Sequence, residues 1–292
     1  MNGAWLQFIA SGLTVGAIYA LVALGFSIIY NASGAINFAQ GEFVMIGGMS
    51  AVTFVGAGLP LWAAVPLAVL AAGGVGLLLE KLAIEPARRA DTVTLIIITI
   101  GASLLLRGMA QVLWDKRVHP LPAFSGDKPL QLLGRHGAAA EPVGAGGAPR
   151  WPWSRLSAFF GRTLFGKAIR ATAFNPLAAR LMGINTRQVL LASFGLAAML
   201  GALAGVLVAP ITFTSYDTGV MLGLKGFAAA MLGGLGSFPG AVLGGLLLGL
   251  VEGLGAGFVS SAYKDAIAFV IILAVLFFMP GGLLGARRSD RV

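Results

Sequence analysis

The sequence contains no cysteine, so disulfide bonds and cysteine-ligated metal sites are excluded. It is also poor in ionisable residues: Asp, Glu, Lys and Arg make up 11% of the 292 residues, against about 25% in soluble domains. The two histidines, His119 and His136, stand in polar stretches without the spacing of metal ligands. Nucleophiles, bases and acids do not cluster along the chain. We therefore expect no catalytic residue, no metal site and no bound cofactor.

Apolar residues dominate the composition, at 58% of the chain with a mean hydropathy of +0.89. A soluble core of this length is too small to bury so much apolar surface, whereas apolar runs of about 20 residues suit helices that cross a bilayer. The 43 glycines fit this interpretation, because close backbone approach drives helix association in membranes. The composition predicts an all-α, polytopic membrane helical bundle in a single domain, residues 1–292.

The net charge of +9 does not indicate a nucleic-acid partner, because the cations are scattered between apolar runs. That pattern is typical of cytoplasmic loops biased towards Lys and Arg. We expect about eight membrane helices, at Trp5 to Tyr30, Phe38 to Gly58, Leu61 to Ile84, Thr92 to Trp114, Val189 to Pro210, Gly219 to Gly236, Ala241 to Val259 and Ala266 to Met279.

Short loops rich in Lys and Arg stay in the cytoplasm, which orients the chain. The basic segments are the loop from Lys81 to Arg89, residues 162–187 and the tail from Arg287 to Arg291, so the N-terminus is expected outside. If the first two segments are both cytoplasmic, one further crossing must lie between Trp114 and Arg162.

Residues 131–160 are a poor candidate for that crossing, because they are rich in Gly, Pro and Arg. Prolines break helices, and a central charge costs about 2.5–3.5 kcal/mol on insertion scales. The segment is an extramembrane loop, a broken span, or the product of a reading-frame error. We favour the third explanation, because ordinary sequence resumes abruptly at Phe160; resequencing the encoding DNA tests it.

Residues 165–187 contain a short helix that the sequence caps by itself. Asn175 is a good N-cap, and Pro176 suits the first helical position, where its missing N–H costs nothing. Gly183 can end the helix in a left-handed conformation. We expect Ala178 and Ala179 on the surface of this helix, where a partner can approach; an ordinary interfacial helix is the alternative.

A polar interruption between the first two apolar runs, Asn31 to Glu42, is a second candidate. Non-helical backbone at membrane depth is tolerated where protein buries it or where it lines a cavity. The segment is therefore a candidate for lining a translocation path, and the polar groups that would do so are Asn37, Gln40 and Glu42. The alternative is a plain cytoplasmic turn, with Glu42 placed favourably in a first helical turn.

Glycines recur every fourth residue at Gly245, Gly249, Gly253 and Gly257, which places them on one helix face and predicts a close helix contact, with a second subunit as one candidate partner. Glu252 lies in the same helix, and we expect it to be an interhelical hydrogen-bonded or snorkelling carboxylate. Glu80 and Arg107 are expected to be interfacial anchors near helix ends.

Several motifs resemble the permease subunits of bacterial ABC importers. The run from Arg170 to Asn185, RATAFNPLAARLMGIN, is similar to the cytoplasmic coupling loop of the branched-chain amino-acid family. Four further runs resemble the first, H-type permease of that family: Gly16 to Leu21, Gly34 to Phe43, Gly223 to Gly240 and Ser261 to Phe269. The chain departs from the family at Gln40, where His is expected, and at residues 131–160, where the family has a membrane helix.

The resemblance implies a permease in the bacterial inner membrane that works by alternating access. It implies that residues 165–187 dock on a cytoplasmic ATPase, through Arg170, Asn175, Pro176, Ala178, Ala179, Arg180 and Gly183. The implied partners are a second permease, two ATP-binding subunits that hydrolyse the ATP, and an extracytoplasmic substrate-binding protein. Branched-chain amino acids are the expected cargo. Urea or short amides remain alternatives, as does a stand-alone secondary transporter or channel.

Overall fold

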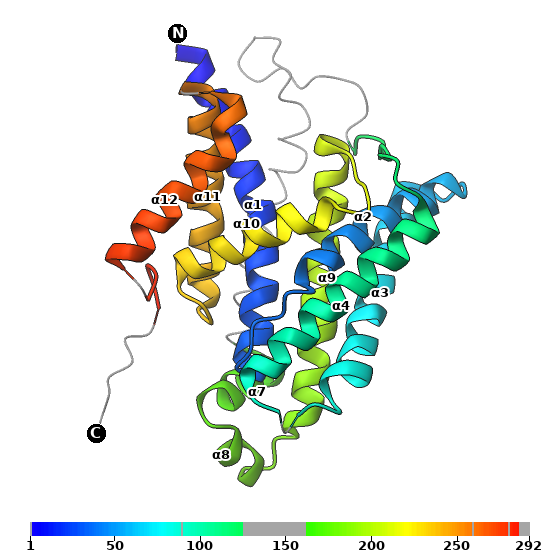
Figure 1. Ribbon diagram of the computed structural model, residues 1–292, viewed down its shortest axis with the longest axis vertical. Helices are drawn as coiled ribbons and strands as arrows, with labels where there is room; N and C mark the ends of the chain where they lie inside the picture. The colour runs from blue at the N-terminus through cyan, green and yellow to red at the C-terminus, as the bar shows by residue number, and fades with distance from the viewer. Residues whose placement is uncertain (1, 89, 125–161, 259, 280, 286–292) are drawn as a thin grey trace.

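The computed structural model describes residues 2–88, 90–124, 162–258, 260–279 and 281–285, and these residues form an all-α bundle (Figure 1). The helices are α1 (Asn2–Ser33), α2 (Gln40–Gly56), α3 (Leu61–Leu79) continued by the π-helix η1 (Glu80–Ile84), α4 (Thr92–Trp114), α7 (Leu164–Phe174), α8 (Pro176–Leu181), α9 (Thr186–Thr212), α10 (Thr218–Gly233), α11 (Phe238–Phe258), the 3₁₀ turn η2 (Ser261–Tyr263) and α12 (Lys264–Phe278).

Five segments of the described chain are long and apolar enough to cross a membrane, which confirms the polytopic fold. They are Gln7–Ser33, Leu61–Ile84, Thr92–Trp114, Thr186–Thr212 and Phe238–Phe258. The other three expected spans are shorter helices: α2, α10 and α12 contain 17, 16 and 15 residues. At 1.5 Å per residue each measures about 23–26 Å, less than the roughly 30 Å of a hydrocarbon core.

The bundle consists of two units of opposite direction, α1 to α4 and α9 to α12. In Figure 1, α1 and α3 run downwards, whereas α9 and α11 run upwards. The contacts are reciprocal: α1 packs on α11 as α9 packs on α3, and α10 packs on α1 as α2 packs on α9. Inverted repeats of this kind are common in transporters and bring equivalent helices together at mid-membrane.

The glycine stripe of α11 packs against α1. A Cβ atom at Gly249 would lie 2.3 Å from the Cα atom of Gly16, and one at Gly253 would lie 2.8 Å from that of Gly12. Gly245 meets the backbone of Ala20, and Gly257 meets the ring of Phe8. The stripe is therefore filled within the chain, and the second subunit considered from the sequence is not its partner.

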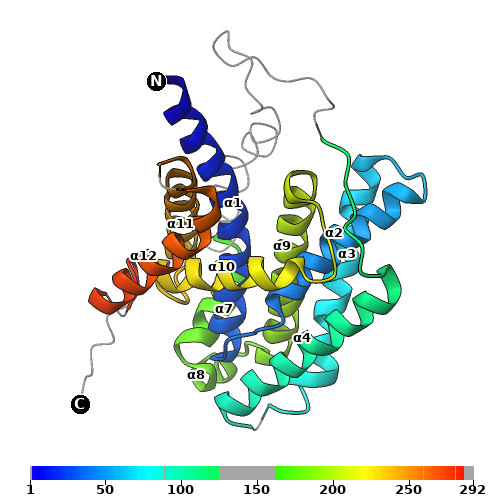
Figure 2. The same cartoon turned by 45° about the horizontal axis from the view of Figure 1, so that its top comes forward.

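The basic loops lie at one end of the bundle, called the basic end here. Arg187 at the start of α9 forms an ion pair with Glu85, which follows η1, so the two loops are in contact. In both views α7 and α8 lie at this end, opposite the N-terminus (Figures 1 and 2). The chain leaves α4 at the opposite end and enters α7 at the basic end. The prediction of an additional crossing between Trp114 and Arg162 concerns residues that lie mostly outside the described part of the chain, as does the whole of segment 131–160.

Candidate functional site

Two non-helical segments enter the middle of the bundle, each followed by a short helix. Residues 34–39 precede α2, and residues 213–217 precede α10. The first turns of these helices meet closely, since a Cβ atom on Gly41 would lie 2.3 Å from the carbonyl oxygen of Gly219. In Figure 2, α10 lies across α1 instead of parallel to it. The polar break seen in the sequence is therefore buried in protein and is not a plain turn at the surface.

Neighbouring side chains satisfy the amides of this irregular backbone, as a low-dielectric setting requires. The Phe38 N–H donates to the Thr99 hydroxyl at 3.1 Å, and the Ala39 N–H donates to Asn37 Oδ1 at 3.1 Å. The Ser215 N–H donates to the Thr218 hydroxyl at 2.9 Å. Thr99 lies well inside α4, so the break before α2 reaches membrane depth.

A cavity of about 170 Å³ lies where α2, α4 and α10 meet. Its walls are mainly apolar and include Phe26, Phe38, Leu104, Val220, Leu224 and Phe227; its polar groups are Glu42, Ser103 and Arg107. A small, mostly apolar cavity with a few convergent polar groups is typical of a site for a small molecule.

Glu42 and Arg107 form an ion pair, with Arg107 in the second half of α4, and Ser103 hydrogen-bonds to Glu42. Arg107 approaches Glu42 Oε1 through Nη2 at 2.9 Å and Nε at 3.3 Å, and the Ser103 hydroxyl donates to the same oxygen at 2.8 Å. The Glu42 side chain is 2% exposed and that of Arg107 is 30% exposed. The expectation that Arg107 is an interfacial anchor is therefore wrong: its partner, 65 residues away, draws it into the bundle.

The three residues considered for the pathway have different surroundings in the structure. Glu42 lines the cavity. Asn37 is 1% exposed and accepts the Ala39 amide, whereas Gln40 is fully buried and donates to the carbonyl oxygen of Ala197 at 2.9 Å. Gln40 occupies the space left by the missing side chain of Gly25, where a Cβ atom would lie 2.1 Å from its Nε2 atom. Gln40 is thus placed to join α1, α2 and α9.

This packing predicts a compensating pair of substitutions. Gly25→Ala should destabilise the chain by about 1–3 kcal/mol, since the new methyl group overlaps the Gln40 amide. In a Gln40→Ala background the same change should cost much less, because the overlapping atoms are gone. Thermal unfolding of the four purified proteins, followed by size-exclusion chromatography, measures this coupling; additive losses would contradict it.

A second buried cluster joins α1, α10, α11 and α12. Lys225 Nζ contacts Glu252 at 2.9 Å and Asp265 at 2.7 Å, and the Tyr19 hydroxyl donates to Glu252 at 2.7 Å. The prediction of an interhelical hydrogen-bonded Glu252 is confirmed. Glu80, by contrast, is fully buried in η1, so it is not the interfacial anchor expected from the sequence.

At the basic end, α8 is capped as the sequence predicts. Asn175 Oδ1 accepts the amides of Leu177 and Ala178 at 3.0 Å, Pro176 is the first helical residue, and Gly183 has a φ of +85°. Arg180 Nε donates to the Thr186 hydroxyl at 2.8 Å, which ties α8 to the start of α9. Arg170 is exposed on α7. The result is a short, rigid projection at the end of the bundle.

The face that α8 presents differs from the expected one. Ala178 is exposed, but Ala179 is only 4% exposed and faces inwards, because the Asn175 cap and the Arg180 contact fix the rotation of the helix. Large apolar residues are exposed here: Phe174 is 94%, Leu181 81% and Met182 83% exposed, with Leu177 beside them. Apolar side chains gathered at such a projecting end are typical of a contact with another protein or with the membrane surface.

Comparisons with known proteins identify this arrangement. The sequence pattern of the family described as "Branched-chain amino acid transport system / permease component" matches residues 8–133 and 155–276. The chain belongs to this family. The high-affinity branched-chain amino acid transport system permease LivH of Escherichia coli K12 is 33% identical over 99% of this chain and 98% of its own length. BraD of Pseudomonas aeruginosa, described likewise, is 34% identical over 99% and 98%.

Two further similarities cover less of the relative's length or are lower in sequence identity. The autoinducer 2 import system permease LsrC of E. coli O9:H4 is 32% identical, over 63% of this permease and 54% of its own length. The solved structure of PsaBC from Streptococcus pneumoniae in complex with Fab has a TM-score of 0.51 at 15% identity, covering 95% of this permease and 96% of that chain, and shares the fold. The family pattern leaves residues 134–154 unmatched, and these lie within the atypical segment 131–160.

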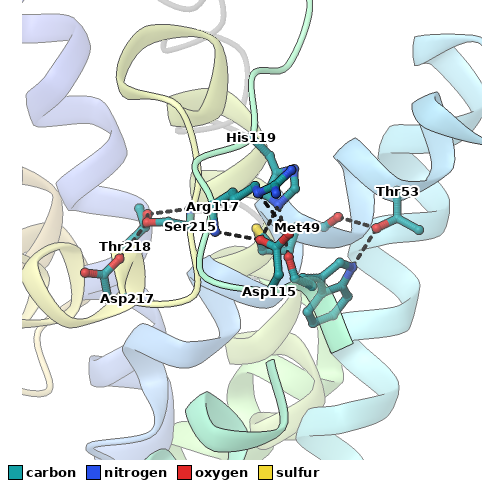
Figure 3. Close-up of polar contacts among 9 residues, drawn as sticks. Met49, Thr53, Asp115, Arg117, His119, Ser215, Asp217 and Thr218 are labelled. Carbon is teal, nitrogen blue, oxygen red and sulfur yellow. Dashed lines mark hydrogen bonds and ion pairs between the residues drawn. The ribbon is translucent and has the colours of Figure 1, made fainter. Parts of the chain in front are cut away.

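At the end opposite α8, the permease has a polar network that the sequence did not indicate. Trp114 Nε1 donates to the Thr53 hydroxyl at 2.7 Å, and His119 forms an antiparallel backbone bridge with Thr214. Asp115 lies 3.5 Å from the His119 ring, and Ser215 contacts Asp217 at 2.6 Å (Figure 3). The end of α4 is thereby attached to α2, and the segment after it is attached to the chain entering α10.

Proposed function

We propose that this permease forms half of the translocation pathway of an ATP-driven importer for branched-chain amino acids in a bacterial inner membrane. The family and the full-length similarity to LivH and BraD support the substrate class. The observation that carries the proposal is the projection of α8, because a self-sufficient channel or transporter has no use for an apolar docking face at its basic end.

In this proposal α8 docks on a cytoplasmic ATP-binding subunit, and one such subunit serves each of two permeases. Both ends of α8 are fixed, by Asn175 and by the bond between Arg180 and Thr186, so a push on the helix passes to α9 instead of bending a loop. Gly183 permits the sharp turn between the two helices. ATP is hydrolysed by the partners, and an extracytoplasmic binding protein delivers the amino acid.

Co-purification tests the assembly. The tagged permease, expressed together with the ATPase, second permease and binding protein of the importer, should bring down the ATPase and the second permease. Reconstituted liposomes containing ATP should then accumulate [³H]leucine only when binding protein is outside. Accumulation without ATPase would support a secondary transporter or channel instead, and competition by urea or acetamide but not by isoleucine would support the small-amide alternative.

A further inference from the structure

We propose that the cavity between α2, α4 and α10 binds the amino-acid zwitterion, with the ammonium group on Glu42 and the carboxylate on Arg107. This inference rests on the proposed function and adds to it a substrate site within the membrane subunit. Such a site would let the permease select its cargo independently of the binding protein.

Both members of the ion pair retain unused bonding capacity. All the contacts made by Glu42 fall on Oε1, from Ser103 and Arg107, while its buried Oε2 atom has no hydrogen-bond partner among the described residues. Arg107 contacts Glu42 through Nε and Nη2, and a guanidinium carries five N–H donors in a fixed fork. A buried acceptor without a partner therefore lies beside a guanidinium that carries further donors, one charge for each of the two charged groups of an α-amino acid.

The rest of the cavity suits a small aliphatic side chain. Phe26, Phe38, Val220, Leu224 and Phe227 supply apolar walls, and the volume of about 170 Å³ is below the roughly 300–1,000 Å³ of sites for drug-sized ligands. Gly41 and Gly219 at the base have no room for a Cβ atom, so the backbone itself forms that boundary. The chemistry favours Leu, Ile or Val over larger or charged amino acids.

A contribution to folding stability does not by itself explain why an ion pair lies at this depth in the membrane. Burying two charges costs several kcal/mol per ion, and apolar replacements of a buried pair are often neutral or stabilising. Ionisable residues within membrane segments therefore indicate function by default. The structural alternative is that the pair merely fixes α4 to α2, which otherwise touch over a small area.

Ligand analogues distinguish these roles. The complete importer, in nanodiscs and without binding protein, is equilibrated with [³H]leucine at up to millimolar concentration. The competitors are leucine, 4-methylpentanoate, which lacks the ammonium group, and 3-methylbutylamine, which lacks the carboxylate. The wild-type importer should bind leucine and should bind each analogue at least about 10-fold more weakly, because each analogue lacks one of the two charges that the ion pair would hold.

Each single variant should lose the ability to distinguish leucine from only one of the two analogues. In the Glu42→Gln variant, the affinity for leucine should fall about 10-fold or more, and 4-methylpentanoate should compete as well as leucine does. In Arg107→Lys, which keeps the charge but loses the fork, 3-methylbutylamine should approach leucine instead. The double variant Glu42→Gln/Arg107→Gln keeps a neutral hydrogen-bonding pair between α2 and α4, and should bind all three ligands alike.

Asp265→Asn is the control, because it breaks a half-buried ion pair with Lys225 that does not line the cavity. Its analogue ratios should equal those of the wild type. If the affinity ratios between the analogues and leucine were unchanged in the Glu42 and Arg107 variants, the ion pair would be only a structural contact and the inference would be overturned. An importer that transports leucine without binding it in the absence of binding protein would also overturn it, while leaving the proposed function intact.

Discussion

Leu181→Asp should abolish leucine-stimulated ATP hydrolysis by the importer while leaving the permease folded and inserted. Leu181 is 81% exposed at the end of α8, so the change removes little packing within the described chain. If this face docks in a cleft of an ATPase, the aspartate places an unpaired charge in an apolar contact. Central apolar contacts of this kind contribute about 2 kcal/mol or more, so coupled hydrolysis should fall at least ~30-fold.

Two further variants make this result specific. Val118→Asp changes an equally apolar residue, 61% exposed, at the opposite end of the bundle and should leave coupled hydrolysis unchanged. Ala179→Glu, by contrast, is unsuitable as a docking test, because Ala179 is buried and a charge there should disrupt the loop itself. Normal ATPase activity and co-purification of the Leu181 variant would exclude α8 as the docking element.

The features that the sequence predicted correctly are those that depend on neighbouring residues. The α8 cap requires only Asn175, Pro176 and Gly183, within nine positions. Helix α4 begins and ends where its apolar run does, at Thr92 and Trp114. Such patterns are local, because hydrogen bonding within a helix and burial in lipid act on each segment separately.

The features that the sequence could not supply depend on residues far apart. Arg107 looked like an anchor because its partner, Glu42, lies on another helix, and Lys225 gave no signal of the cluster it forms with Glu252. Likewise, α2 and α10 read as full spans, because apolar composition does not reveal that the preceding segments already lie inside the bundle.

The second large effect concerns the contact between α1 and α11, the most extensive in the bundle. Gly249→Leu should prevent assembly of the folded permease. A Cβ atom at Gly249 would lie 2.3 Å from both the Cα and the backbone nitrogen of Gly16, so no side-chain rotation relieves the overlap. Moving the helices apart would give up contacts along their whole length, at a cost above the roughly 1–3 kcal/mol typical of overpacking.

Gly74→Leu is the matched control, since it makes the same change in α3 at a position with no neighbouring atom within 4 Å of an added Cβ. It should keep a monodisperse elution profile and an unchanged melting temperature, whereas the Gly249 variant should aggregate or be degraded. The contrast tests whether glycine serves here to bring backbones together, as the small-residue rule for membrane helices holds. Because α1 and α11 belong to different units of the inverted repeat, a folded Gly249 variant would also contradict the reciprocal packing on which the central cavity depends.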